Sequence, residues 1–106
     1  MIAAEFKQRK GTGIVEFSIK GHSGYSECGS DIVCAAVSSA AYMAANTITD
    51  VIGVKPAIDL SDGFLVLKLS LQDALKCSVI TEGLKLHVLA LSEQYQDFIK
   101  VKISEV

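Results

Sequence analysis

The sequence predicts one α+β domain in which two helices pack on a mostly antiparallel sheet of four to five strands. Three observations favour this class. Short segments alternate between apolar and polar residues and are joined by glycine-containing turns, which is typical of antiparallel hairpins. Two longer segments have helical spacing, and the resulting order is ββαββαβ. A length of 106 residues suits a single core, so the domain is expected to span residues 1–106.

The N-terminal segment is predicted to form a β-hairpin. Residues 1–9 alternate weakly between apolar and charged side chains, and residues 14–20 alternate clearly. Residues 11–13 (GTG) supply the turn. Because a connection this short joins neighbouring antiparallel strands, the two segments are expected to pair.

Residues 31–52 are predicted to form the first helix, which Ser30 or Asp31 caps and Gly53 ends. No charged residue lies between Ile32 and Thr49, so a membrane span has to be considered. Alanines dominate the segment, however, and polar residues interrupt it. These are Ser38, Ser39, Asn46, Thr47 and Thr49. We therefore expect a buried central helix and no membrane contact.

A second hairpin follows the first helix. Residues 54–60 carry the only proline and are predicted to form an edge strand. Residues 61–63 (SDG) suit a turn, and residues 64–70 alternate as the paired strand. The last strand of the chain is expected over residues 98–103.

The second helix, predicted over residues 71–96, has two adjoining apolar faces. One face holds Leu71, Leu75, Val79, Leu86 and Ala90, and the other holds Ile80, Leu84, Val88, Leu91 and Tyr95. An arc this wide is expected to pack on the sheet and on a partner subunit, and an apolar content of 50% also favours a homodimer. Gly83 lies mid-helix, where a kink or a close contact is expected.

Charge and cysteine usage exclude several function classes. The net charge is −2 and Arg9 is the only arginine, so direct nucleic-acid binding is disfavoured. The start of the chain has no apolar core typical of a signal peptide. The three cysteines (Cys28, Cys34 and Cys77) form no CxxC pair, which suggests free thiols in a reducing cytoplasm.

The chemistry is concentrated where a glycine-rich loop meets the first helix. His22 lies in the loop and Cys34 in the first helical turn. A helix N-terminus favours the thiolate, and a nearby imidazole can act as its base. Free amides at Cys34 and Ala35 are expected to hold a developing oxyanion. This arrangement is a candidate for acyl transfer.

Each of these residues also has a simpler interpretation. Cys34 suits a small core residue, and His22 suits a solvated loop residue. Asp31 either caps the helix or orients His22. Ser38, one turn after Cys34, either packs locally or supports the site. Tyr25 either covers the site or anchors the loop.

A metal site is a weaker alternative. His22, Cys28 and Cys34 are three possible zinc ligands, but their spacing matches no common zinc signature and no fourth ligand is evident. We therefore expect no metal and no cofactor. Cys77 and His87 are interpreted as packing or surface residues.

Residues 21–39 contain a Gly-His pair, a glycine-containing loop and the run DIVCAAVSS. This pattern resembles that of the ribosomal-processing cysteine protease family, Prp. The resemblance implies a cytoplasmic α+β homodimer with His22 and Cys34 as the catalytic pair. It also implies a substrate, the N-terminal extension of a large-subunit ribosomal protein. Cys28 matches no position of the pattern.

The resemblance further implies a substrate loop that closes over an extended peptide. Its expected members are Gly21, Ser23, Gly24 and Tyr25, and the loop should be mobile in the free enzyme. A non-enzymatic, ribosome-associated factor that binds a peptide in the same groove is the alternative function.

Overall fold

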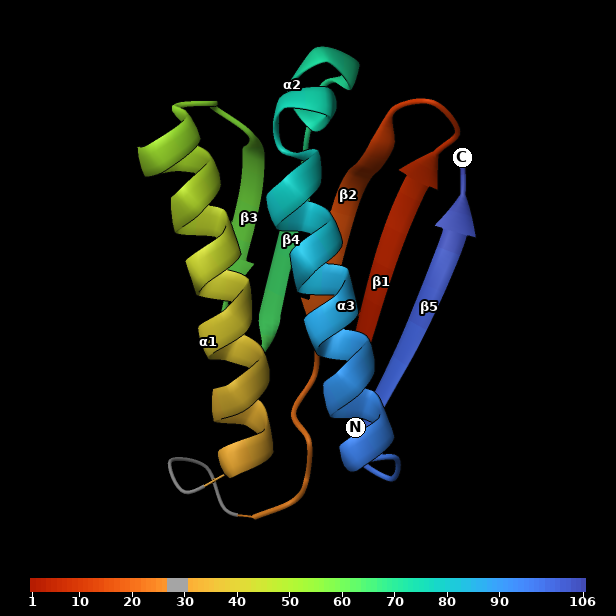
Figure 1. Cartoon of the computed structure of the whole chain (residues 1–106). Helices are drawn as coiled ribbons and strands as arrows, with labels where there is room; N and C mark the ends of the chain where they lie inside the picture. Colours follow the sequence, from red (N-terminus) through yellow and green to blue (C-terminus); the bar gives the residue numbers. More distant parts are fainter. Residues whose placement is uncertain (27–30) are drawn as a thin grey trace.

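The computed structural model (Figure 1) describes residues 1–26 and 31–106, and its elements follow the expected order. The strands are β1 (Ile2–Arg9), β2 (Gly13–Lys20), β3 (Ala57–Ser61), β4 (Phe64–Lys68) and β5 (Ile99–Glu105). The helices are α1 (Ile32–Asn46), the π-helical segment η1 (Thr47–Ile52), α2 (Leu71–Lys76) and α3 (Ser78–Gln94). The predicted α+β class and the five-stranded sheet are confirmed.

The five strands form one sheet in the order β3-β4-β2-β1-β5. The pairs β1–β2, β2–β4 and β3–β4 are antiparallel. For β1–β2 and β3–β4 this is expected, because tight turns join these strands. β5 instead runs parallel to β1, with Ile2 opposite Ile99. The helices between β4 and β5 account for this. They carry the chain back across the length of the sheet, so that β5 runs in the same direction as β4 and therefore as β1.

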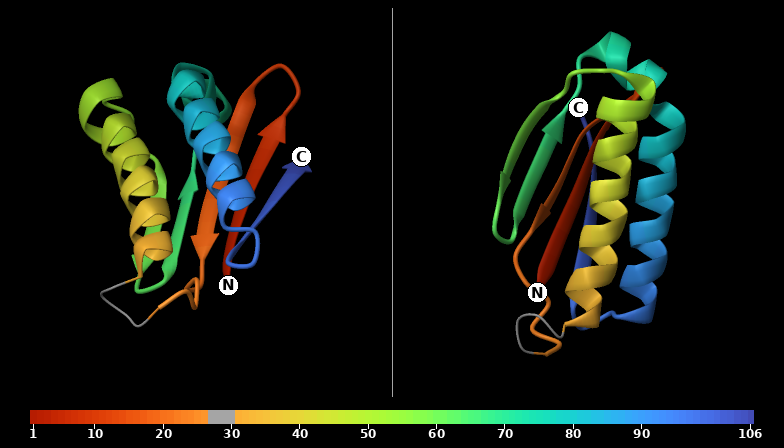
Figure 2. Two further views of the ribbon diagram at one scale, coloured as in Figure 1. Left: turned by 60° about the horizontal axis from the view of Figure 1, so that its bottom comes forward. Right: turned by 90° about the vertical axis from the view of Figure 1, so that its left-hand side faces the viewer.

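α1 and α3 lie side by side on one face of the sheet, and the other face is uncovered (Figure 2). Phe6 and Phe17 project from neighbouring strands into the core, with ring centroids 6.2 Å apart. By length and composition Ile32–Ile52 could span a membrane, but Val33 and Val37 are fully buried in the domain. This burial is the pattern expected of a core helix.

The single helix predicted over residues 71–96 is interrupted at Cys77, which separates α2 from α3. Cys77 leaves helical geometry (φ −98°, ψ 4°), and the buried Thr81 hydroxyl donates to its carbonyl at 3.1 Å. Gly83, where a kink or close contact was expected, lies within α3, and a Cβ there would meet nothing within 4 Å. The irregularity therefore falls at a buried cysteine and not at the glycine.

β3 is the edge strand predicted from its proline-containing approach, and α1 does not cover it completely. Ile58 and Leu60 remain 43% and 52% exposed, although their partners Leu67 and Leu65 on β4 are buried. The uncovered part of this hairpin forms one wall of the groove described next.

Candidate active site

A groove of about 640 Å³ lies between α1, the β3–β4 hairpin and the segment after β2. Its lining includes His22, Asp31, Cys34, Ser38, Tyr42 and Leu60. Four of these were singled out from the sequence as catalytic or supporting residues. The spacing of the loop histidine and the helical cysteine in the sequence could not show that they meet. In the structure both line the same groove.

Cys34 lies in the first turn of α1, and Asp31 is the N-cap of that helix. Asp31 Oδ1 accepts hydrogen bonds from the amides of Val33 and Cys34, both at 3.0 Å. The capping interpretation of Asp31 is therefore confirmed, while Ser30 and Cys28 lie outside the described residues. No hydrogen bond joins Asp31 to His22 within residues 1–26 and 31–106.

The Cys34 thiol is partly buried, and its sulfur accepts a hydrogen bond from the Ser23 amide at 3.2 Å. Ser23 directly follows His22 in the chain. This contact brings the loop backbone against the sulfur and the histidine into the same part of the groove. A main-chain donor on sulfur stabilises the thiolate more than the thiol, because hydrogen bonds to a charged acceptor are stronger.

His22 rests on the turn between β3 and β4. Its Nε2 lies 3.8 Å from Asp62 Oδ2, and the Gly21 amide donates to the Gly63 carbonyl at 2.8 Å. The sequence predicted this Asp-Gly turn but gave no sign that it meets residue 22. Asp62 is therefore a carboxylate at the site that the sequence did not indicate.

Ser23, which was expected only as part of a substrate loop, is almost completely buried. Its hydroxyl donates to Asp31 Oδ2 and accepts from the Tyr25 amide at 3.0 Å. The hydrogen bond from Ser23, together with those from the Cys34 amide, the Cys34 side chain and the Val33 amide, lowers the pKa of Asp31 to about 2 against the opposing effect of burial. Asp31 is thus held as a carboxylate by donors on both sides.

The expectation that the first-turn amides are free is wrong. The Cys34 amide donates to Asp31 Oδ1, and the Ala35 amide donates to the Asp31 carbonyl at 3.0 Å. A capping side chain and ordinary helical bonding occupy both donors. Ser38, four residues after Cys34, is exposed and lines the groove.

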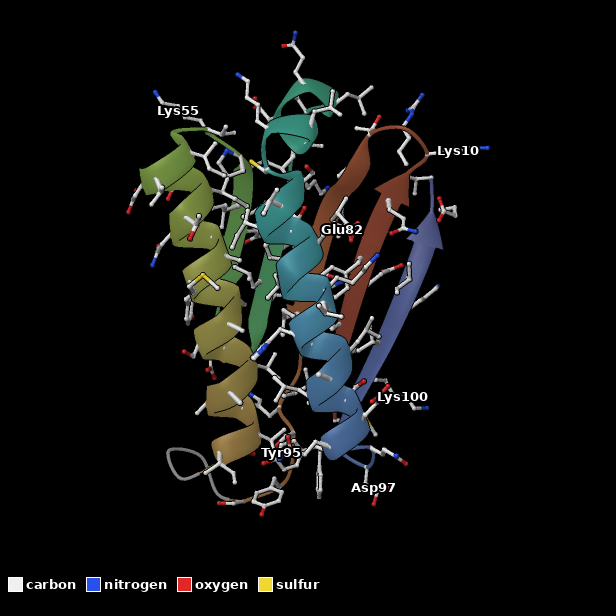
Figure 3. The ribbon with its side chains drawn as sticks, viewed as in Figure 1. Lys10, Lys55, Glu82, Tyr95, Asp97 and Lys100 are labelled. Carbon is white, nitrogen blue, oxygen red and sulfur yellow. The ribbon has the colours of Figure 1, made fainter. Side chains whose placement is uncertain are left out.

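The described part of the loop is anchored at several points. Tyr25 makes edge-on ring contacts with Tyr95 and Phe98, with centroids 6.0 and 5.2 Å apart. Figure 3 shows Tyr95 at the end of α3 that borders this loop. Of its two interpretations, Tyr25 therefore takes the anchoring one. Gly21 (φ 91°) and Gly24 (φ 73°) adopt left-handed backbone conformations that favour glycine.

The remaining candidates lie away from the groove. Burial raises the pKa of the Cys77 thiol, which is fully buried, and His87 is exposed on α3. Within the part of the chain that the structure describes, no group of three histidine, cysteine or acidic residues could hold a metal ion. Cys28, one of the three possible zinc ligands, is not among the described residues.

Comparison with known proteins identifies the family. The model of the family described as cysteine protease Prp matches residues 1–100. The chain belongs to the cysteine protease Prp family. It is therefore a cysteine protease, and the recognition based on residues 21–39 is confirmed.

Individual relatives and solved structures match over nearly their whole length. The ribosomal processing cysteine protease Prp of Bacillus subtilis (strain 168) is 26% identical over 107 residues, which cover 95% of this chain and 96% of the relative. A crystal structure from Streptococcus mutans is 30% identical, with a TM-score of 0.80, and the match covers 100% of this chain and 96% of that one. The Staphylococcus aureus Prp structure with a covalently linked product peptide has a TM-score of 0.90 at 21% identity, covering 98% of this chain and 100% of that one. This chain thus has the fold of the Staphylococcus aureus Prp structure over nearly its whole length.

Proposed function

We propose that this Prp-family protease removes the N-terminal extension of a large-subunit ribosomal protein, with Cys34 as nucleophile and His22 as general base and acid. The observation that carries the proposal is the hydrogen bond from the Ser23 amide to Cys34 Sγ at 3.2 Å. Ser23 directly follows His22 in the chain, so the histidine-bearing loop contacts the sulfur. The curated Bacillus relative is named a ribosomal processing protease, which supports the substrate class.

In this mechanism His22 takes the thiol proton, and the Cys34 thiolate attacks the peptide carbonyl carbon. The tetrahedral intermediate collapses to a thioester as His22 protonates the leaving amine. Water, deprotonated by His22, then hydrolyses the thioester and regenerates the thiol. The Cys34 amide already donates a hydrogen bond to Asp31. The Ser38 hydroxyl in the groove is therefore our candidate for a donor to the oxyanion.

The groove suits an extended peptide with apolar residues. Leu60 and Tyr42 offer exposed apolar surface on opposite walls, and Ile19 and Leu65 contribute to the lining. The β3 edge also leaves main-chain groups free for pairing with an extended chain, a common mode of peptide recognition. Gly21, Ser23, Gly24 and Tyr25 form the loop at the end of this groove, where we place contacts with the substrate.

We also propose that the enzyme acts as a homodimer in the cytoplasm. Leu71, Leu75, Val79 and Leu86 are 49%, 57%, 87% and 71% exposed in one chain, which leaves an apolar surface on α2 and α3. A second copy would cover it. The cytoplasm is where ribosomal proteins are made and where free thiols persist.

The test is cleavage of a peptide that carries the candidate extension. Cys34→Ala and His22→Ala should each lower kcat/KM at least about a thousandfold, since loss of either member disables the pair. His87→Ala, which removes an exposed histidine on α3, is the matched control and should cleave like wild type. Wild-type rates in both site variants would refute the catalytic pair. Tight, stoichiometric binding of the peptide by wild type without product would favour the peptide-binding factor instead.

A further inference from the structure

Ser23 connects the cap of α1 to the reactive sulfur. It is 3% exposed, and three hydrogen bonds converge on it. Its amide donates to Cys34 Sγ, its hydroxyl donates to Asp31 Oδ2, and the same hydroxyl accepts from the Tyr25 amide. Ser23 is thus the residue through which the loop touches both the helix cap and the thiol.

The two donors of Ser23 are geometrically coupled. Asp31 is fixed by its second oxygen, which caps the Val33 and Cys34 amides. A hydroxyl bonded to this fixed carboxylate limits the rotation and displacement of the Ser23 backbone. The position of the Ser23 amide relative to Cys34 Sγ, one helical turn away from the cap, is limited with it.

The coupling also extends to the histidine. His22 is the preceding residue, and the Gly21 amide is bonded to the Gly63 carbonyl. The loop is therefore held before and after His22, at Gly21 and at Ser23, and the N-terminal amino group of Met1 donates to the His22 carbonyl. Loss of the Ser23 attachment would leave the histidine held from the Gly21 side while the sulfur is no longer tied to the loop, and small displacements of catalytic groups cost large factors in rate.

We propose that Ser23 is a positioning residue of this protease, whose hydroxyl bond to Asp31 holds its main-chain N–H on the Cys34 sulfur and keeps His22 beside it. The proposal rests on the function proposed above. This role of Ser23 is separate from the substrate contacts proposed for the loop. In this proposal Asp31 has a second task beyond capping, as the anchor of the loop.

The test is a double-mutant cycle with two readouts. Ser23→Ala, Asp31→Asn and the double variant are compared with wild type for kcat and KM, and for the pH dependence of Cys34 alkylation by iodoacetamide, mapped by mass spectrometry. In Ser23→Ala we expect kcat to fall about tenfold with KM changed less than about twofold, because an interaction is lost that matters for the chemical step. The alkylation profile should change, with slower alkylation of Cys34 at neutral pH, because the sulfur loses a fixed donor.

The double-mutant cycle tests whether Ser23 and Asp31 act together on Cys34 or have two independent structural roles. The double variant should be no more impaired than the worse single variant, because Ser23→Ala removes the donor and Asp31→Asn removes the charged acceptor of the same hydrogen bond. Ser92→Ala is the matched control, since its hydroxyl also bonds within the domain, to the Leu89 carbonyl at 2.7 Å, but Ser92 does not line the groove. It should leave both readouts unchanged. If Ser23→Ala fails to fold, Asp31→Asn, which keeps a capping group, provides the same two measurements.

Unchanged kcat and an unchanged alkylation profile in a folded Ser23→Ala variant would overturn the proposal. The proposed protease function would still stand in that case, provided that wild type cleaves the peptide. Additive effects in the double variant would also overturn it. Failure of the protease function is recognised separately, because wild type would then yield no product. Alkylation does not need a substrate, so a Ser23-dependent profile in that case would still support the link between Ser23 and the thiol.

Discussion

At the scale of single residues, Asp31 resolves a conflict at this site. A carboxylate near a thiol opposes thiolate formation. Here, however, Asp31 accepts from the Ser23 hydroxyl on one oxygen and from two helix amides on the other, so hydrogen bonds stabilise its negative charge. Cys34 keeps a separate donor, the Ser23 amide. The cap and the nucleophile can therefore coexist within one helical turn.

Asp31 should make stability depend on pH at the acid end. Its pKa in the folded protein is about 2, below the ordinary value of 3.8. A depressed carboxyl pKa contributes stability that is present above the unfolded value and is lost as the pH falls through the folded value. Unfolding by urea at pH 5 to pH 2 should therefore show a loss of stability between about pH 4 and pH 2 that is smaller in Asp31→Asn.

The control for this measurement is Asp97→Asn, which changes an exposed carboxyl beyond α3 (Figure 3) and should keep the wild-type acid profile. Glu5, whose pKa is lowered chiefly by the Ser104 hydroxyl, contributes its own acid dependence in all three proteins. An acid profile of Asp31→Asn that coincides with wild type would contradict the account of Asp31.

At the scale of elements, the β3–β4 turn supports the catalytic loop. Gly63 adopts a left-handed conformation (φ 65°), and its carbonyl accepts from the Gly21 amide. A Cβ at Gly63 would lie 2.8 Å from His22 Nε2. Because the contacted atom is the end of a side chain, the histidine would move before the backbone did.

Gly63→Ala should therefore impair activity more than stability. We expect kcat/KM to fall about tenfold or more through displacement of His22, with a stability cost of about 1–2 kcal/mol from the positive φ. Gly11→Ala is the matched control, since Gly11 also lies in a hairpin turn with φ 80° but has nothing within 4 Å of an added Cβ. It should show a similar stability cost and wild-type activity. Equal activity in the two variants would refute support of His22 by this turn.

Much of the element order could be predicted, because it depends on local patterns. Alternation and turn residues indicated both hairpins, and the acidic residue before Ile32 indicated the cap of α1. The interruption at Cys77 and the π-helical end of α1 could not be predicted, since they depend on the packing of buried side chains. The site followed the same division. His22, Asp31 and Cys34 belong to one continuous motif, whereas Asp62 reaches His22 only through tertiary folding.

At the scale of the whole molecule, α3 separates two kinds of apolar residue. Leu84 and Val88 are buried in the core, while Leu86 and Val79 are exposed to solvent in the single chain. The two apolar faces expected from the sequence thus have different environments. Within the described residues, only the face with Leu84 and Val88 is covered. The face with Val79 and Leu86 is the surface that we assign to the dimer.

The double variant Val79→Lys/Leu86→Lys should convert the protein to a monomer. Charges at two exposed apolar positions would be desolvated in a dimer interface, which is strongly unfavourable. Sedimentation equilibrium at micromolar concentration should give twice the 11.3 kDa chain mass for wild type and 11.3 kDa for the variant. Ile103→Lys, at an exposed position on β5, is the control and should remain dimeric. A wild-type mass of one chain would contradict the dimer.

In the proposed mechanism, Cys34 forms a thioester with the substrate. The most direct measurement is intact-mass and peptide-mapping mass spectrometry of wild-type enzyme, quenched with acid during turnover of the extension peptide. We expect an adduct on Cys34 whose mass equals the N-terminal cleavage fragment less one water, and no adduct on Cys77. Cleavage that proceeds without any adduct on Cys34, or with the adduct on another residue, would contradict it.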